Sequence, residues 1–296
     1  MTKEGQRMKR ISRIILILGL LFSGCTAKVE PENSYQVEAF PLAAASWPLQ
    51  ALLNELHREL SPDPDWIAGE ASGSTQAAWR TLIQVVNPKP RMILAYEPSA
   101  LMREELQDYD TLWQAQTIGY DALVMVTGQE NPVDTLTLEE IRDIYVGKIT
   151  NWKQVGGEDR AIRIYAQDEN SGLQTAFERQ IMQGQPIRLP ELEWVYERPG
   201  VVRQEIAAFD AEADALGFSS LQMVTQVNPQ PEIKIVRIAG ILPNAKTIEN
   251  GKYPLRLPVL LASNTASDAT IAGITDWLLS QRGQQWLSEH GLVPVQ

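Results

Sequence analysis

The sequence predicts an α/β fold, and three observations support that class. From about residue 36 onward, stretches with the apolar spacing of helices alternate with short apolar stretches typical of strands. The chain has 296 residues, enough for two domains that each bury a core. Hydrophobic residues make up 44% of it and charged residues 21%, as in globular proteins.

The first predicted elements are a helix and two strands. Residues 49–60 carry leucine at five positions of one helical face, so we expect a helix that ends before Ser61 and Pro62. Pro90–Tyr96 and Asp121–Thr127 are short apolar runs, which indicate buried strands.

In the middle of the chain, Thr137 and Glu140 have the spacing of a capping box, which predicts a helix from there to about residue 147. Residues 148–157 (KITNWKQVGG) are typical of turns. Ile162–Ala166 is expected to be the next strand.

Strands are also expected at Ala215–Ser220 and Ile233–Ile238. Tyr253–Ala262 reads as a long strand with prolines near its start, suited to crossing between domains. The chain then ends in an apolar helix around Ile271–Leu279, followed after Gly283 by a second short helical piece.

The N-terminus predicts an export signal. Residues 1–13 carry five basic side chains, and residues 14–22 are apolar, a run too short for a stable membrane anchor. Cys25, the only cysteine, follows in LLFSGC, which resembles a bacterial lipoprotein signal, although Phe22 is bulkier than usual there. We expect residues 1–24 to be the signal peptide and Cys25 the diacylated first residue. The alternative is an ordinary signal peptide with an unmodified cysteine.

Residues 25–35 are polar and are expected to form a tether. Two acyl chains on Cys25 would hold the protein stably on a membrane. Without residues 1–24 the chain loses five of its 26 basic and one of its 37 acidic residues, which leaves a net charge of −15. This charge argues against nucleic acid as a partner. It still permits a small anion bound locally by backbone dipoles.

The stretch YAQDENSGLQTAF, residues 165–177, predicts a strand, a polar turn and a helix that opens at Ser171 and Gly172. Ser171 and Gln174 repeat the capping-box spacing. The first N–H groups of a helix lack intrahelical partners and carry the positive end of its dipole, so they favour an anion. This loop contains no lysine or arginine of its own.

Nothing in the sequence indicates an enzyme, a metal site or a cofactor. The two histidines, His57 and His290, lie on helices expected at the surface, far from any Cys or His partner, so zinc-ligand spacing is absent. The G-x-S-x-G, G-x-G-x-x-G and P-loop motifs are absent as well. Ser171 has no histidine nearby in the sequence to activate it as a nucleophile. We therefore expect binding without covalent chemistry. The alternative is an exported enzyme in which Ser171 is a nucleophile activated by a partner distant in the sequence.

Two segments at a fixed separation carry a resemblance to a known family. DTLTLEEIRDIYVGKITNWKQVGG (residues 134–157) and DENSGLQTAF (residues 168–177) resemble the phosphate-binding lipoproteins of ABC importers. The similarity extends from about Ala39 to the C-terminus. It implies a type II periplasmic-binding-protein fold, with mixed sheets flanked by helices in two lobes and a ligand cleft between them. Lobe 1 would comprise residues 36–118 and 251–296 and lobe 2 residues 119–250, with Asp121–Thr127 and Pro258–Ala262 at the hinge.

The family binds phosphate through four segments, and the first three have counterparts here. The first implies Ser46 and the backbone at Trp47, with a helix N-cap as the alternative role of Ser46. The second implies Ser72, or Ser74 as second choice, with capping as the alternative. The third implies Glu97, whose carboxylate would accept the O–H that phosphate retains and sulfate lacks. A surface salt bridge is the alternative for Glu97.

The fourth segment implies Ser171 and Gly172, and here the sequence departs from the family. Gln167 replaces an arginine that neutralises phosphate, and Leu173 replaces a Ser or Thr donor. Gln167 retains one neutral donor, whereas Leu173 most simply extends the apolar face of the helix. Another arginine would have to supply the charge, the candidates being Arg163, Arg198 and Arg203.

The resemblance implies a lipid-anchored, extracytoplasmic and monomeric solute-binding protein. It would deliver phosphate, or a related oxyanion, to the permease and ATPase subunits of an ABC importer. The alternative is a sensor or interaction protein of the same fold, whose altered pocket binds phosphate weakly or binds another ligand such as a phosphorylated metabolite.

Overall fold

The computed structural model describes residues 35–63, 65–66, 73–83, 91–108, 113–188, 193–195, 214–264 and 268–295. All of them belong to one compact unit, Tyr35–Gln296. Six residues named above lie outside the described part: Phe22, Cys25, Ser72, Pro90, Arg198 and Arg203. Within the described residues, no helix combines the length and the apolar composition that crossing a membrane requires.

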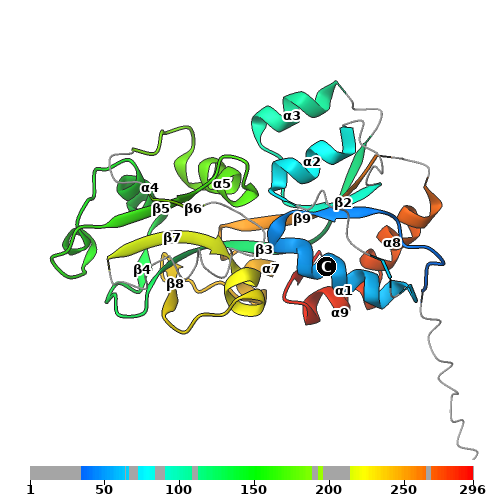
Figure 1. Cartoon of the computed structure of the whole chain (residues 1–296). Helices are drawn as coiled ribbons and strands as arrows, with labels where there is room; N and C mark the ends of the chain where they lie inside the picture. Colours follow the sequence, from blue (N-terminus) through cyan, green and yellow to red (C-terminus); the bar gives the residue numbers. More distant parts are fainter. Residues whose placement is uncertain are drawn as a thin grey trace, which may run out of the picture. The chain divides into compact units, whose positions relative to one another are not determined.

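Ten strands of the described residues form a mixed sheet (Figure 1). β1 is parallel to β2, and β5 is parallel to both β6 and β7, whereas β9 is antiparallel to β2 and β3. Seven of the described strands follow one another in a single hydrogen-bonded row, the main path of the sheet. Outside this row, β8 and β10 pair with β3, and β4 pairs with β8. Along that path the order is β1 (Ala43–Ala45), β2 (Met92–Ala95), β9 (Arg256–Ser263), β3 (Gln114–Gly128), β7 (Ala215–Ser220), β5 (Arg163–Gln167) and β6 (Glu193–Val195). The other three are β4 (Thr135–Leu136), β8 (Ile233–Ile238) and β10 (Val293–Pro294).

The long strand β3 belongs to two groups of strands (Figure 1). Its first part pairs with β9, ending where Ala122 lies opposite Arg256. Its second part pairs with β7, from Leu123 opposite Ser220, and with β8. We call β1, β2, β9 and the first part of β3 the β2 group, and β5, β6, β7, β8 and the second part of β3 the β7 group. The strand predicted at residues 121–127 is thereby confirmed as part of β3, and the strand predicted at Tyr253–Ala262 is β9, which begins only at Arg256.

Helices with one buried face cover these strands. α1 buries four leucines and ends before Ser61, as predicted. α2 packs against β1 and β2, whereas α5 packs against β3, β5 and β7. The ring of Phe177 in α5 stacks on that of Phe218 in β7, with 4.2 Å between centroids. The helices are α1 (Gln50–Leu60), α2 (Thr75–Ile83), α3 (Ala100–Gln107), α4 (Leu138–Tyr145), α5 (Gly172–Phe177), α7 (Ala245–Glu249), α8 (Ala269–Leu279) and α9 (Gln281–Glu289).

The capping box predicted for α4 is present. The Thr137 hydroxyl accepts from the Glu140 N–H at 3.1 Å, and the Glu140 carboxylate accepts from the Thr137 N–H at 2.7 Å. The turn-rich segment after α4 contains a short 3₁₀ helix, η3 (Trp152–Val155), which ends at Gly156 with a φ of 87°. A left-handed residue at that position satisfies the helix end at little steric cost because it is glycine.

Three expectations about local structure were wrong. The Gln174 side chain does not complete a capping box with Ser171, since its oxygen accepts from the Gln167 N–H at 3.0 Å instead. Gly283 does not separate two helices but lies inside α9, where a Cβ would come within 2.0 Å of the Trp277 carbonyl oxygen at the tight junction with α8. His57 is not at the surface, because only 5% of it is exposed and its ring lies among aromatic neighbours.

Candidate functional site

The ends of β1 and β2 meet the start of α2 at Ser46. The Ser46 N–H donates to the Leu94 carbonyl at 2.9 Å, which fixes it beside the end of β2. A parallel bridge joins Ser46 to Gly73 on the other side. In that bridge the Trp47 N–H donates to the Gly73 carbonyl at 2.9 Å, and the Gly73 N–H donates to Ala45 at 3.3 Å. The first two segments predicted to bind the ligand therefore lie next to each other.

Ser46 and Thr75 contribute two buried hydroxyls to this junction. Both residues are fully buried, and among the described residues neither hydroxyl oxygen has a hydrogen-bond partner. Ser46 precedes the short 3₁₀ helix η1 (Trp47–Leu49), but its side chain makes no capping bond. Ser74, in contrast, accepts from the Ala77 N–H at 3.2 Å and caps α2. The alternative capping role thus applies to Ser74 and not to Ser46.

The loop before α5 uses its polar side chains internally. The Ser171 hydroxyl donates to the Gln167 side-chain oxygen at 2.6 Å and accepts from the Leu173 N–H at 3.1 Å. The Gln167 side-chain amide donates to the Phe218 carbonyl at 3.0 Å. Leu173 itself is 3% exposed and lies in the hydrophobic core, where Phe177 of the same helix also packs.

Gly172 brings the start of α5 against the start of α2 and the end of β2. A Cβ on Gly172 would lie 2.5 Å from the Thr75 hydroxyl oxygen and 3.0 Å from the Tyr96 Cβ. Only glycine permits so close an approach. Beside this contact, the Gln76 N–H donates to the Asn170 carbonyl at 3.2 Å. The fourth predicted segment therefore meets the second, although about 95 residues separate them.

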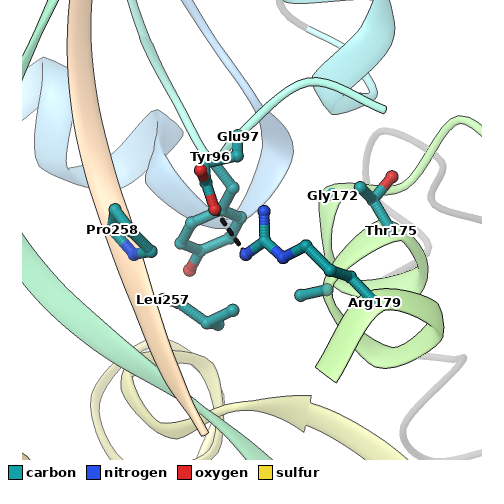
Figure 2. A pocket seen from close by; sticks show the side chains of 8 residues that line it. Tyr96, Glu97, Gly172, Thr175, Arg179, Leu257 and Pro258 are labelled. Atoms are coloured by element: carbon teal, nitrogen blue, oxygen red, sulfur yellow. Dashed lines mark ion pairs between the residues drawn. The ribbon is translucent and has the colours of Figure 1, made fainter. Parts of the chain in front are cut away.

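A small hollow lies beside this contact (Figure 2). Within it, Arg179 from the segment after α5 extends toward Tyr96 and forms an ion pair with Glu97 (Figure 2). The other carboxylate oxygen of Glu97 pairs with Arg103 at 3.1 Å. Glu97 is thus shared by two arginines. The residues that line the hollow are Tyr96, Glu97, Gly172, Thr175, Ala176, Arg179, Leu257 and Pro258.

Tyr96 connects the hollow to a buried carboxylate on β3. Its hydroxyl donates to Asp121 at 2.8 Å. The other Asp121 oxygen accepts from the N–H groups of Ala122 at 2.7 Å and Gln222 at 3.1 Å. Burial raises the pKa of Asp121, and these hydrogen bonds oppose that rise. Asp121 lies where β3 changes from pairing with β9 to pairing with β7.

Of the three arginines that the sequence offered as replacements, only Arg163 lies in the described part of the chain. It stands at the start of β5, whereas Gln167 stands at the end of that strand. Its guanidinium pairs with Asp214 at 3.2 Å, and it does not line the hollow.

Thr75, Arg179 and Asp121 are not among the site residues predicted from the sequence. Arg179 follows Gly172 by seven residues, so a helical phase would place both on one face, and that spacing was the available signal. Asp121 is the one charged residue of β3 and directly precedes the apolar run of residues 122–126, a pattern that indicates a buried and bonded carboxylate. Thr75 gave no such signal beyond its place in a turn of small hydroxyl residues.

A family model described as a PBP superfamily domain matches residues 99–282, more than half of the chain. The chain belongs to the PBP superfamily. The predicted class, an α/β fold of the two-lobed periplasmic-binding-protein type, is thereby confirmed. The match includes Gly172 and Arg179, together with the whole of β3, β5 and β7.

This PBP-superfamily chain is similar to two relatives named phosphate-binding protein PstS. The relative from Borreliella burgdorferi is 24% identical over 181 residues, which cover 60% of this chain and 64% of the relative. The relative from Bacillus subtilis is 25% identical over 259 residues, which cover 86% and 79%. The chain therefore spans just under two thirds of the first relative's length.

Among the solved structures that share this fold is one from Clostridium perfringens. It is assigned as a phosphate ABC transporter substrate-binding protein, with bound phosphate. The TM-score is 0.69 at 20% identity, and the match covers 86% of this chain and 99% of that chain.

Proposed function

We propose that this chain is the solute-binding component of an ABC importer and binds phosphate, or a related oxyanion, between the β2 group and the β7 group. The names of its relatives support this class of ligand. The structural observation that carries the proposal is the pair of buried hydroxyls of Ser46 and Thr75, which have no hydrogen-bond partner in the part of the chain that the structure describes. An unpaired buried hydroxyl costs about 1–3 kcal/mol. A tetrahedral oxyanion would offer acceptors to both.

Binding would act through closure of two lobes. We assign residues 36–118 and 251–296 to lobe 1 and residues 119–250 to lobe 2, so that Ser46 and Thr75 lie in one lobe and Gly172 in the other. An anion that contacts both lobes only when they are closed shifts the population toward the closed form. The permease and ATPase would receive that form from a monomer held outside the cytoplasm by lipid on Cys25, and no covalent chemistry is involved.

A second candidate function is a sensor or interaction protein with weak or altered ligand binding. The bonds within the α5 loop favour it, because the hydroxyl of Ser171 and the amide group of Gln167 are bonded to protein groups. Leu173 adds no side-chain donor. A preference for another oxyanion or for a phosphorylated metabolite in a thermal-shift panel would support this candidate.

The proposed function is tested by removing the two hydroxyls singly, as Ser46→Ala and Thr75→Val, in the chain from residue 27 onward. A hydrogen bond to a charged group contributes about 1.5–3 kcal/mol, so each variant should bind phosphate roughly tenfold or more weakly in equilibrium dialysis. The matched control is Thr150→Val at an exposed loop position, which should bind like the parent. Unchanged affinity in both hydroxyl variants would contradict the proposed site.

A further inference from the structure

The positive charge that the loop before α5 lacks is supplied by Arg179, which follows α5 in the chain. Arg179 lies in the π-helical segment η4 (Glu178–Met182), which continues directly from α5. Gly172, Thr175, Ala176 and Arg179 all line the hollow, as residues spaced by three, four and seven positions on one helical face should. The guanidinium therefore enters the same space that Gly172 borders (Figure 2).

The segment that carries Arg179 is held in place from two sides. The Gln180 side-chain amide donates to the Arg256 carbonyl on β9 at 3.0 Å. The Ile181 carbonyl accepts from the Arg142 side chain at 2.6 Å. Arg179 is thus presented from a fixed backbone, although 43% of its side chain is exposed.

Glu97 holds Arg179 but does not depend on it. The Glu97 side chain is 25% exposed, and its carboxylate pairs with Arg179 through one oxygen and with Arg103 through the other. If an anion took over Arg179, Glu97 would keep Arg103, so the exchange would leave no buried charge unpaired. Carboxylates and phosphates both fit the planar donor fork of arginine, which makes such an exchange chemically matched.

We infer that Arg179 is the cationic ligand-binding residue of the proposed oxyanion site, and that the Glu97 carboxylate competes with the oxyanion for it. This inference rests on the proposed function and adds two residue roles to it. Arg179 would supply the charge that Gln167 cannot. Glu97 would lower the apparent affinity for the anion, because the anion must replace the Glu97 carboxylate at the Arg179 guanidinium in order to bind.

The role inferred for Glu97 predicts the opposite effect on phosphate affinity from the role of an acceptor for the phosphate O–H. A competing carboxylate lowers the affinity for every anion, so Glu97→Gln should increase the affinity for both phosphate and sulfate by several-fold. An accepting carboxylate favours phosphate alone, so the same variant would weaken phosphate and strengthen sulfate.

The test is calorimetric titration of the chain from residue 27 onward with inorganic phosphate and with sulfate. Arg179→Gln should weaken phosphate roughly tenfold, and Arg179→Lys, which keeps the charge but not the fork, should fall between it and the parent. The matched control is Arg163→Gln, which removes another half-buried ion-paired arginine and should leave the affinity unchanged. Circular dichroism melts check that each variant is folded.

The outcomes separate this inference from the function on which it rests. If the parent binds phosphate and folded Arg179→Gln binds it within about twofold as tightly, the inference is overturned while the proposed function stands. A loss of phosphate affinity in Glu97→Gln would overturn the competing role. If neither the parent nor Glu97→Gln binds phosphate or sulfate, both the proposed function and the inference are overturned.

Discussion

Asp121 is a carboxylate enclosed at the point where β3 passes from the β2 group to the β7 group. It is 1% exposed, and it accepts bonds from Tyr96 on one oxygen and from Ala122 and Gln222 on the other. These donors come from the end of β2, from β3 itself and from the residues after β7. One side chain therefore ties together three segments that meet at the proposed hinge.

The raised pKa of Asp121 predicts how stability depends on pH. A carboxyl whose pKa is higher in the folded than in the unfolded state keeps its proton up to a higher pH in the folded state. Its contribution to the free energy of unfolding is therefore complete below about pH 4, the unfolded value, and is lost as the pH rises through the folded value. Asp121→Asn removes this loss, so its stability relative to the parent should increase with pH.

Urea unfolding of the parent and of Asp121→Asn at pH 4 and pH 7 measures that difference. About 1.4 kcal/mol is expected for each unit by which the pKa is raised. A difference in unfolding free energy that is the same at both pH values would show that burial does not raise the pKa of Asp121.

Some residues of the site could be foreseen and others could not. Ser46 and Gly172 followed from matching short segments to a family, because their place in each turn is local. Whether a hydroxyl caps a helix or remains unpaired depends on neighbours distant in sequence, so Ser46, Ser74 and Thr75 could not be told apart. To predict Arg179 as a site residue, one needs both its helical spacing from Gly172 and its ion pair with Glu97. The spacing can be read from the sequence, but the ion pair cannot.

Among the helices, α4 tests most directly how much a capping box read from the sequence contributes to stability. Its first turn is closed by the reciprocal bonds of Thr137 and Glu140 at an exposed position. Thr137→Ala should cost about 1 kcal/mol of unfolding free energy and lower Tm by a few degrees. The exposed Thr150→Ala is the matched comparison in a thermal melt. An equal effect in both variants would show that the box adds no stability.

Most elements were predictable because their signals are local. The strands at residues 215–220 and 233–238 have the predicted bounds, and β5 is shifted by one residue. The errors came from tertiary contacts. Gly283 reads as a helix break in the sequence, but in the fold it lets α9 approach the last turn of α8. Gln174 reads as the partner of a cap, but its side chain bonds to the end of β5.

For the whole molecule, the decisive contacts join segments far apart in the chain. Gln76 of α2 bonds to Asn170 in the loop before α5, and Arg179 in the segment after α5 pairs with Glu97, which follows β2. The passage of β3 between two groups of strands could not be derived from apolar spacing alone. The resemblance to a two-lobed family implied it, and the match to the PBP superfamily agrees with it.

The proposed oxyanion site lies where α2, β2 and α5 meet. Calorimetric titration of the chain from residue 27 onward with phosphate tests it most directly, in phosphate-free buffer and after unfolding and refolding to remove bound ligand. We expect saturable binding at micromolar or tighter affinity. The absence of any heat of binding, with protein shown to be folded, would contradict it.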